Sequence, residues 1–229
     1  MVRTFKDIDA ARDISFAAAP KASTAGAGGN TVQMGFNGGK EQVMFKLFSA
    51  SIDAAHAPYG VENANPNAPG DLQIKIELDA KSRAFIESFE KAIIQAGAKY
   101  SLQWFKKQLS ADAVSTMLVS SIKTNGTNGQ DNAELLKIKV VSEGKRPTVV
   151  RVATRKADGL LTRPEIGTLD DLKGPCYVLP VIRVANGVWF LNKGFGASLV
   201  ADEVCVIRDS SSHPSEDNFA FSDVEMDEE

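Results

Sequence analysis

The clearest hydrophobic pattern in the chain is the strict alternation of apolar and polar residues over Leu72–Leu78. Side chains of a strand point alternately to its two faces, so this segment predicts a half-buried strand. Asp79 follows as a helix cap. Apolar residues from Phe85 to Ile94 then recur at helical spacing, with charged residues between them, which predicts an amphipathic helix.

Shorter apolar runs predict the remaining elements. A shorter helix is expected after Ser110, and 100–109 is a second helical segment after Gly97. Asp158-Gly159 and Asn186-Gly187 are tight hairpin signals. The other expected strands are 43–48, 135–141, 148–156, 177–184, 188–191 and 197–207. This inventory is mostly β with an inserted helix. It fits an OB-fold-like, five-stranded, partly open Greek-key barrel, and it also fits a generic β-sandwich.

The 229 residues suit a single domain with flanking segments. Residues 1–41 include an Ala/Gly/Ser-rich stretch, so a flexible N-terminal segment is expected there. Residues 42–208 would form the barrel. Residues 209–229 would form an acidic, disordered tail, because a segment with so many carboxylates and so few apolar residues cannot bury enough surface to fold.

Charge is divided unevenly between the body and this tail. The formal net charge is −3, yet residues 1–208 alone carry +5 because the chain from Asp209 onward has eight acids and no Lys or Arg. A positive body attracts polyanions. The tail could occupy the body's cationic groove or bind partner proteins. Its candidate contact residues are Phe219, Phe221, Asp223, Glu225, Asp227, Glu228 and Glu229.

Basic and aromatic residues on the late strands suggest single-stranded nucleic acid as the ligand, since lysines and arginines hold its backbone and aromatic rings stack on its bases. The phosphate-binding candidates are Lys137, Lys139, Arg151, Arg155, Lys156, Arg183 and Lys193. Trp189 and Phe195 are the stacking candidates. Trp104 and Tyr100 are weaker candidates, for which packing in a core is the alternative. Trp189 and Phe190 are strand neighbours and should face opposite ways.

Catalytic and cofactor motifs are missing from this pattern. The chain has two histidines, no nucleophile elbow and no acidic cluster suited to a nuclease metal, so neither an enzyme nor a cofactor is expected. Cys176 and Cys205 lie in apolar runs and are expected to be reduced, buried thiols. With no signal peptide or membrane-length apolar run, we expect an intracellular, soluble protein.

The order of segments resembles the single-stranded DNA-binding replication proteins of podoviruses and of large algal DNA viruses. The best matching stretches are 177–184, Trp189, 194–199 and 204–207 before the acidic tail, together with the strand and helix from Leu72 and a central hairpin over 135–156. The resemblance implies an OB fold, DNA binding with little sequence preference, and homodimers in which each tail covers the partner's groove. It also implies tail contacts with a replicative DNA polymerase and a primase-helicase.

Two features depart from that family. Its bacteriophage members end on an aromatic residue, whereas this chain ends in Asp227-Glu228-Glu229, and the stretch 100–124 is richer in helix signal. The leading hypothesis is a single-stranded DNA-binding protein of viral DNA replication, recombination and repair, in the host cytoplasm or nucleus or in a viral replication compartment. The alternatives are a virion or structural interaction protein and, less favoured, a nucleic-acid-processing enzyme.

Overall fold

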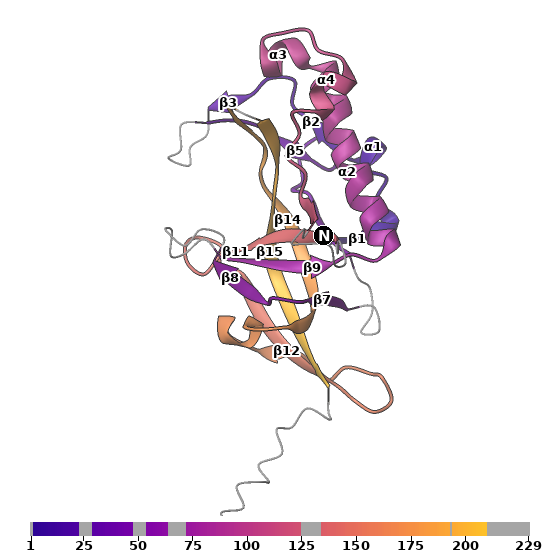
Figure 1. Ribbon diagram of the computed structural model, residues 1–229, viewed down its shortest axis with the longest axis vertical. Helices are drawn as coiled ribbons and strands as arrows, with labels where there is room; N and C mark the ends of the chain where they lie inside the picture. The colour runs from indigo at the N-terminus through magenta and orange to yellow at the C-terminus, as the bar shows by residue number, and fades with distance from the viewer. Residues whose placement is uncertain are drawn as a thin grey trace, which may run out of the picture.

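Two long antiparallel strands form the axis of the fold (Figure 1). They are β14 (Cys176–Leu191) and β15 (Gly194–Asp209), of 16 residues each. This computed structural model describes residues 2–22, 29–47, 54–63, 72–124, 134–192 and 194–209. Burial alternates along much of β14, which buries one face of that strand, whereas most residues of β15 are buried in runs of three or four.

The other strands extend this pair on both sides. The sheet order is β1 (Arg3–Thr4), β6 (Met44–Lys46), β14, β15, β11 (Glu134–Val140), β9 (Leu72–Glu77) and β8 (Val61–Asn63). Shorter strands pair beside this path: β3 (Lys21–Ala22), β4 (Asn30–Val32), β7 (Ala55–Ala57), β10 (Ile122–Thr124), β12 (Val149–Arg155) and β13 (Glu165–Ile166). A separate small sheet joins β2 (Ser15–Phe16) to β5 (Met34–Gly35).

Five strands curl into an incomplete barrel. The hydrogen-bonded neighbours run β7, β14, β15, β11 and β9, and β7 packs back against β9. In the described ranges β9 pairs with β8 and not with β7, so the ring stays open between β7 and β9. An unclosed β-sheet of this kind fits an OB-like fold.

Helices cover one side of this sheet (Figure 1). The longest is α2 (Ala80–Lys99), which begins where the Asp79 carboxylate accepts a hydrogen bond from the Ser82 N–H and which buries Phe85, Ile86, Phe89 and Ile93. The others are η1 (Phe5–Asp7), α1 (Ala10–Asp13), α3 (Ser101–Phe105), α4 (Ala111–Ser115) and η3 (Leu169–Leu172). No helix of the described chain is long and apolar enough to span a bilayer.

The expectation of a mostly β chain with inserted helices is confirmed, as are most of the expected elements. The chain is mostly β with inserted helices, α2 follows β9 through the Asp79 cap, and the Ser110 side chain caps α4. The short helix α3 lies within the expected segment 100–109. Leu136, Ile138 and Val140 are buried while Lys139 on the opposite face is exposed, as the alternation predicts.

The expectation of a flexible segment over 1–41 is wrong for its described parts. Residues 2–22 and 29–41 form short elements, and their apolar side chains join the main core, with Phe36 1% exposed. The core residues on either side of the Ala/Gly-rich stretch are widely spaced in the sequence, so the composition of this region did not indicate that it packs in the core. The low-complexity residues 23–28 lie outside the described ranges.

Two expected hairpins are also wrong. Asn186 and Gly187 have φ of 56° and 73°, but they form a bulge within β14 between the pairs Ala185↔Ser198 and Val188↔Ala197, and the chain does not reverse there. The stretch 135–156 is no hairpin, because β11 and β12 each run parallel to β15 at different points along it. Strand β15 also continues to Asp209, one residue into the expected tail.

Candidate nucleic-acid interface

A groove of about 370 Å³ lies between the β10–β11 ladder and the far end of the β14–β15 pair. We call it the Trp189 groove. Its lining is Val119, Ser120, Ser121, Lys123, Lys137, Lys139, Trp189, Leu191, Ala197, Ser198 and Leu199. Three lysines and a tryptophan therefore share one groove, with apolar side chains between them.

Strand register places the three lysines on one face. Lys137 and Lys139 are two residues apart on β11, and Lys123 of β10 is paired with Leu135 of β11. Paired residues of adjacent strands, and residues two apart on one strand, point to the same face of a sheet. The opposite face of β11 carries Leu136 and Ile138, both fully buried in the core, so the lysines face outward.

The wall that faces these lysines is held to the helix α2. Glu90 of α2 accepts hydrogen bonds from the Ser120 hydroxyl at 2.9 Å and from the Ser121 N–H at 2.6 Å. The Ser121 carbonyl in turn accepts the N–H of Lys137 at 3.1 Å, and Val119 donates to the carbonyl of Phe195 at 2.8 Å. The segment 119–121 therefore bridges β11 and β15.

Trp189 lies half-buried in the groove, with its ring over Gly196. A Cβ added at Gly196 would come within 2.9 Å of the indole Cζ2. The glycine therefore leaves room for the ring. Phe190, the next residue, points the other way and meets Trp104 and Phe195 at centroid distances of 5.6 and 5.9 Å. The expectation that these neighbours face opposite ways is met by the structure.

Phe195 does not occupy the groove, which corrects the stacking assignment. Its side chain is 0% exposed and packs edge-to-face with Phe105 at 5.2 Å. Trp104 is 6% exposed, and its indole N–H donates to the carbonyl of Ala17 at 3.3 Å. Tyr100 stacks against Trp104. These three rings are packed in or against the core under the helices, so the core alternative holds for Trp104 and Tyr100.

Positive charge in the groove is only partly neutralised. Lys75, paired with Lys137 in register, forms an ion pair with Glu62 at 2.7 Å and lies over the ring of Tyr59. Burial opposes ionisation of Glu62, but hydrogen bonds from Lys75 and Gln73 and the charges of Lys75 and Lys137 lower its pKa overall. Neither Lys123 nor Lys137 forms an ion pair with a carboxylate of the described chain.

The other predicted phosphate contacts do not line the groove. Arg151 and Arg155 lie on β12, beside the opposite end of β15, where they form ion pairs with Glu203 at 3.1 Å and Asp209 at 3.5 Å. Lys156 is exposed just beyond them. Arg183 has a side chain only 12% exposed and forms an ion pair with Asp202 at 3.2 Å. Lys193 and all the tail candidates lie outside the described residues.

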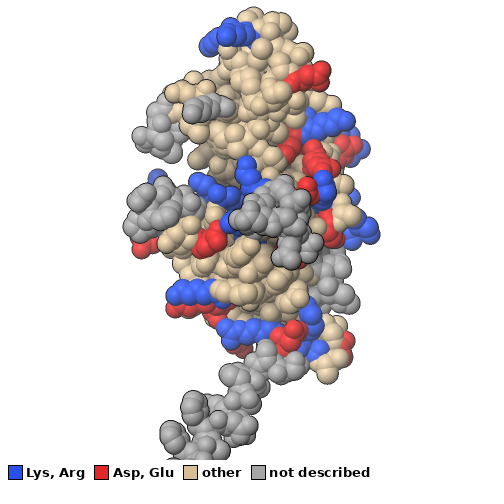
Figure 2. All heavy atoms as spheres, viewed as in Figure 1, with Lys and Arg blue, Asp and Glu red and all other residues tan. Residues whose placement is uncertain are grey.

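Sequence reasoning missed Lys123 and Leu191. Lys123 belongs to a strand of only three residues next to a Gly- and Asn-rich stretch, and so short a segment gives no strand pattern in the sequence. Leu191 is 69% exposed, which the apolar pattern of its strand does not suggest. Figure 2 shows an upper region of the visible face with few charges and, below it, Lys and Arg side chains interspersed with Asp and Glu.

Other chemistry is not built into the described chain. No group of three or more His, Cys, Asp or Glu residues in the described ranges could hold a metal ion. Cys176 and Cys205 are free thiols, as expected, although only Cys205 is fully buried. Burial raises the pKa of both, and nearby Glu203 adds to this at Cys205, so neither thiol is activated as a nucleophile.

No family model and no curated protein sequence matches this chain. Among solved structures it is similar to gp2.5, a single-stranded DNA-binding protein encoded by bacteriophage T7, at 14% identity and a TM-score of 0.42, over 80% of this chain and 96% of that one. It is also similar to the C-terminally truncated single-stranded DNA-binding protein from bacteriophage Enc34, at 13% identity and a TM-score of 0.38, over 83% of this chain and 95% of that one. The Enc34 protein in complex with single-stranded DNA is similar at 12% identity and a TM-score of 0.33, over 83% of this chain and 95% of that one. These likenesses are distant, and the function proposed below rests on the groove.

Proposed function

We propose that this protein binds single-stranded DNA, without sequence preference, along the Trp189 groove. The observation that carries the proposal is that Trp189 and the three groove lysines line one groove. A base can stack on the indole while neighbouring phosphates meet the ammonium groups, and neither contact reads the base sequence.

The groove favours a single strand over a duplex for a geometric reason. In a duplex the base faces are already stacked on one another, so an indole at the bottom of a groove cannot reach them without unstacking. A flexible single strand turns its bases toward the protein at no such cost. Phosphate contacts alone would bind both forms, with an affinity that falls as salt rises.

Roles in viral replication, recombination and repair, with contacts to a polymerase and a primase-helicase, are part of the same proposal. The support is the acidic tail of residues 210–229, whose interleaved phenylalanines could anchor in a partner. We further propose that the tail competes with DNA for the groove and that homodimers form through it. The opposite charges of body and tail support that competition.

The test is the affinity for labelled oligo-dT and for duplex DNA, measured by fluorescence anisotropy across a salt series. The double variant Lys137→Gln/Lys139→Gln should weaken oligo-dT binding about tenfold at low salt and make the salt dependence shallower, since each lost phosphate contact lowers the slope by about 0.7.

The control is Lys81→Gln/Lys91→Gln, which removes two exposed lysines from α2. It changes the net charge equally but leaves the groove intact, and we expect near wild-type binding. Equal effects of the two double variants, or a preference for duplex over oligo-dT, would refute the assignment of the groove.

A further inference from the structure

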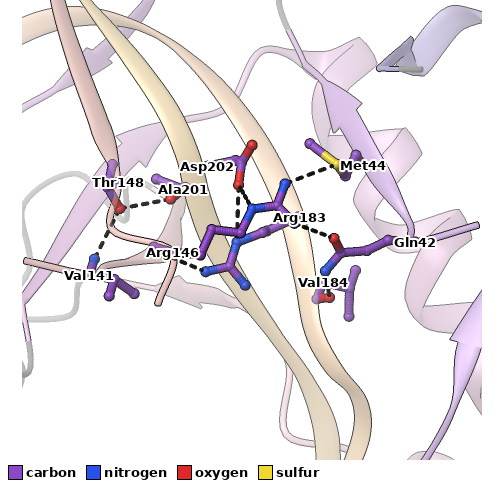
Figure 3. Close-up of polar contacts among 9 residues, drawn as sticks. All are labelled: Gln42, Met44, Val141, Arg146, Thr148, Arg183, Val184, Ala201 and Asp202. Atoms are coloured by element: carbon purple, nitrogen blue, oxygen red, sulfur yellow. Dashed lines mark hydrogen bonds and ion pairs between the residues drawn. The ribbon is translucent and has the colours of Figure 1, made fainter. Parts of the chain in front are cut away.

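Two arginines share one carboxylate, that of Asp202 (Figure 3). The Oδ1 of Asp202 lies 2.6 Å from the Nε of Arg146 and 3.2 Å from the Nε of Arg183. The three residues come from the 141–148 loop, β14 and β15. Arg183 also donates from Nη2 to the carbonyl oxygen of Arg146 at 3.4 Å. We call these three residues the arginine pair site.

The site carries more positive than negative charge. Arg183 is largely buried, and this burial is the main cause that lowers its pKa. The neighbouring charge of Arg146 lowers the pKa further, whereas the ion pair with Asp202 raises it. One carboxylate therefore neutralises only one of the two guanidinium groups. A second anion close to Arg146 would relieve the repulsion between the two arginines.

Arg146 is held in a fixed orientation with one side open. Its Nη1 donates to Gln42 Oε1 at 2.8 Å, and its Nη2 contacts the sulfur of Met44 at 3.5 Å. Gln42 is itself anchored to the carbonyl of Val184 at 3.2 Å. The side chain of Arg146 is nonetheless 48% exposed, and both terminal nitrogens keep N–H groups without a partner in the described chain. A fixed guanidinium fork with free donors suits a phosphate.

The arginine pair site lies next to the Trp189 groove on the same face of the sheet. Val200 of β15 is paired with Lys139 on β11 and with Arg183 on β14, so the three side chains lie in one row across the sheet. Lys139 is part of the groove lining. A strand lying in the groove would therefore reach Arg146 by crossing β15.

We propose that the arginine pair site binds a backbone phosphate of the same single strand, with Asp202 acting as the internal competitor that this phosphate displaces from Arg146. This rests on the function proposed for the groove. Arg183 stays paired with Asp202, and Arg146 exchanges the carboxylate for the phosphate. The carboxylate thus weakens DNA binding while it holds the two arginines in place.

Asp202→Asn and Arg146→Gln test this in opposite directions. In anisotropy titrations with oligo-dT, Asp202→Asn should tighten binding about threefold to tenfold at low salt and steepen the salt slope by about 0.7. Arg146→Gln should weaken binding and make the slope shallower by about the same amount. A purely structural role for Asp202 would instead make both variants bind more weakly.

Arg12 and Asp13 provide matched controls, because they form an ordinary one-to-one ion pair at 2.9 Å on α1. Asp13→Asn and Arg12→Gln make the same charge changes outside the site. The proposal is overturned if Asp202→Asn binds no tighter than Asp13→Asn. If Asp202→Asn does not fold, the test uses Arg146→Gln alone. The proposal is then overturned if Arg146→Gln binds oligo-dT with the same affinity and the same salt slope as Arg12→Gln.

The same titrations separate this proposal from that for the groove. If wild-type protein does not bind oligo-dT, or if Lys137→Gln/Lys139→Gln binds like its control, the groove assignment fails. If the lysine variant is weakened while the variants at 146 and 202 match their controls, only the arginine pair site fails.

Discussion

At the scale of single residues, the chain separates rings that stack in the core from a ring that is open to a ligand. Trp189 and Phe190 are adjacent on β14, and strand geometry alone requires that they face opposite ways. Which of the two faces outward depends on what lies over each face. The helices cover Phe190, while Gly196 and segment 119–121 leave Trp189 partly open.

Phe195 gives the sharpest residue-scale prediction, because its burial contradicts a role in stacking. Phe195→Ala should lower the free energy of unfolding by about 3–5 kcal/mol, as for other buried phenylalanines. The measurement is chemical denaturation, with Leu191→Ala as the control. Leu191 is 69% exposed, so its loss should change stability by no more than about 0.5 kcal/mol.

The milder variant Phe195→Leu separates packing from binding. It should remain folded, with reduced stability, and should bind oligo-dT like the wild-type protein. A large loss of affinity without a loss of stability would show that Phe195 contacts DNA after all.

At the scale of elements, the sequence predicts the strands, the long helix and its cap well, because each depends on neighbours in the chain. Leu72–Glu77 and Ala80–Lys99 follow directly from apolar periodicity and from the Asp79 cap. Predictions fail where distant partners decide the conformation. Asn186-Gly187 has the composition of a hairpin turn, yet β4 and β15 pair with β14 around it and keep it as a bulge.

The candidate site shows the same division. The outward direction of Lys137 and Lys139 follows from the alternation in β11, and it could be predicted. Their meeting with Lys123 depends on the antiparallel pairing of β10 with β11, and their meeting with Trp189 depends on the parallel pairing of β11 with β15, which joins residues far apart in sequence. The ion pairs that engage Arg151 and Arg183 depend likewise on residues of β15.

The bulge in β14 supplies the element-scale prediction. Gly187 has φ of 73°, and a Cβ there would overlap the carbonyl oxygen of Val32 on β4. Gly187→Ala should therefore combine backbone strain with a steric clash and should lower the free energy of unfolding by more than about 2 kcal/mol.

Gly159→Ala is the matched control for this clash. Gly159 has a similar φ of 81°, but no atom lies within 4 Å of its added Cβ. It should therefore show the strain alone, about 1–2 kcal/mol. Equal losses for the two variants in chemical denaturation would mean that the contact between β4 and the bulge contributes nothing.

At the scale of the whole molecule, the division of charge between body and tail is the dominant property. Removing residues 210–229 deletes seven carboxylates and no Lys or Arg, which changes the formal net charge from −3 to +4 and leaves β15 intact. If the tail competes for the groove, the shortened protein should bind oligo-dT about tenfold more tightly at low salt. The difference should shrink as salt screens the charges.

A full-length variant with those seven carboxylates changed to amides separates charge from length, and it should bind like the shortened protein. The measurement is again anisotropy of labelled oligo-dT across salt. Binding that is unchanged or weaker after removal of the tail would contradict the competition.

If Trp189 contacts the bound strand, its intrinsic fluorescence should report binding, and the signal can be assigned because the chain has only two tryptophans. Trp104→Phe leaves Trp189 as the sole emitter, and Trp189→Phe leaves only the buried Trp104. Oligo-dT should quench the emission of Trp104→Phe in a saturable way that added salt reverses, and it should change the emission of Trp189→Phe little. Unchanged Trp189 emission at oligo-dT concentrations that saturate the anisotropy signal would contradict this contact.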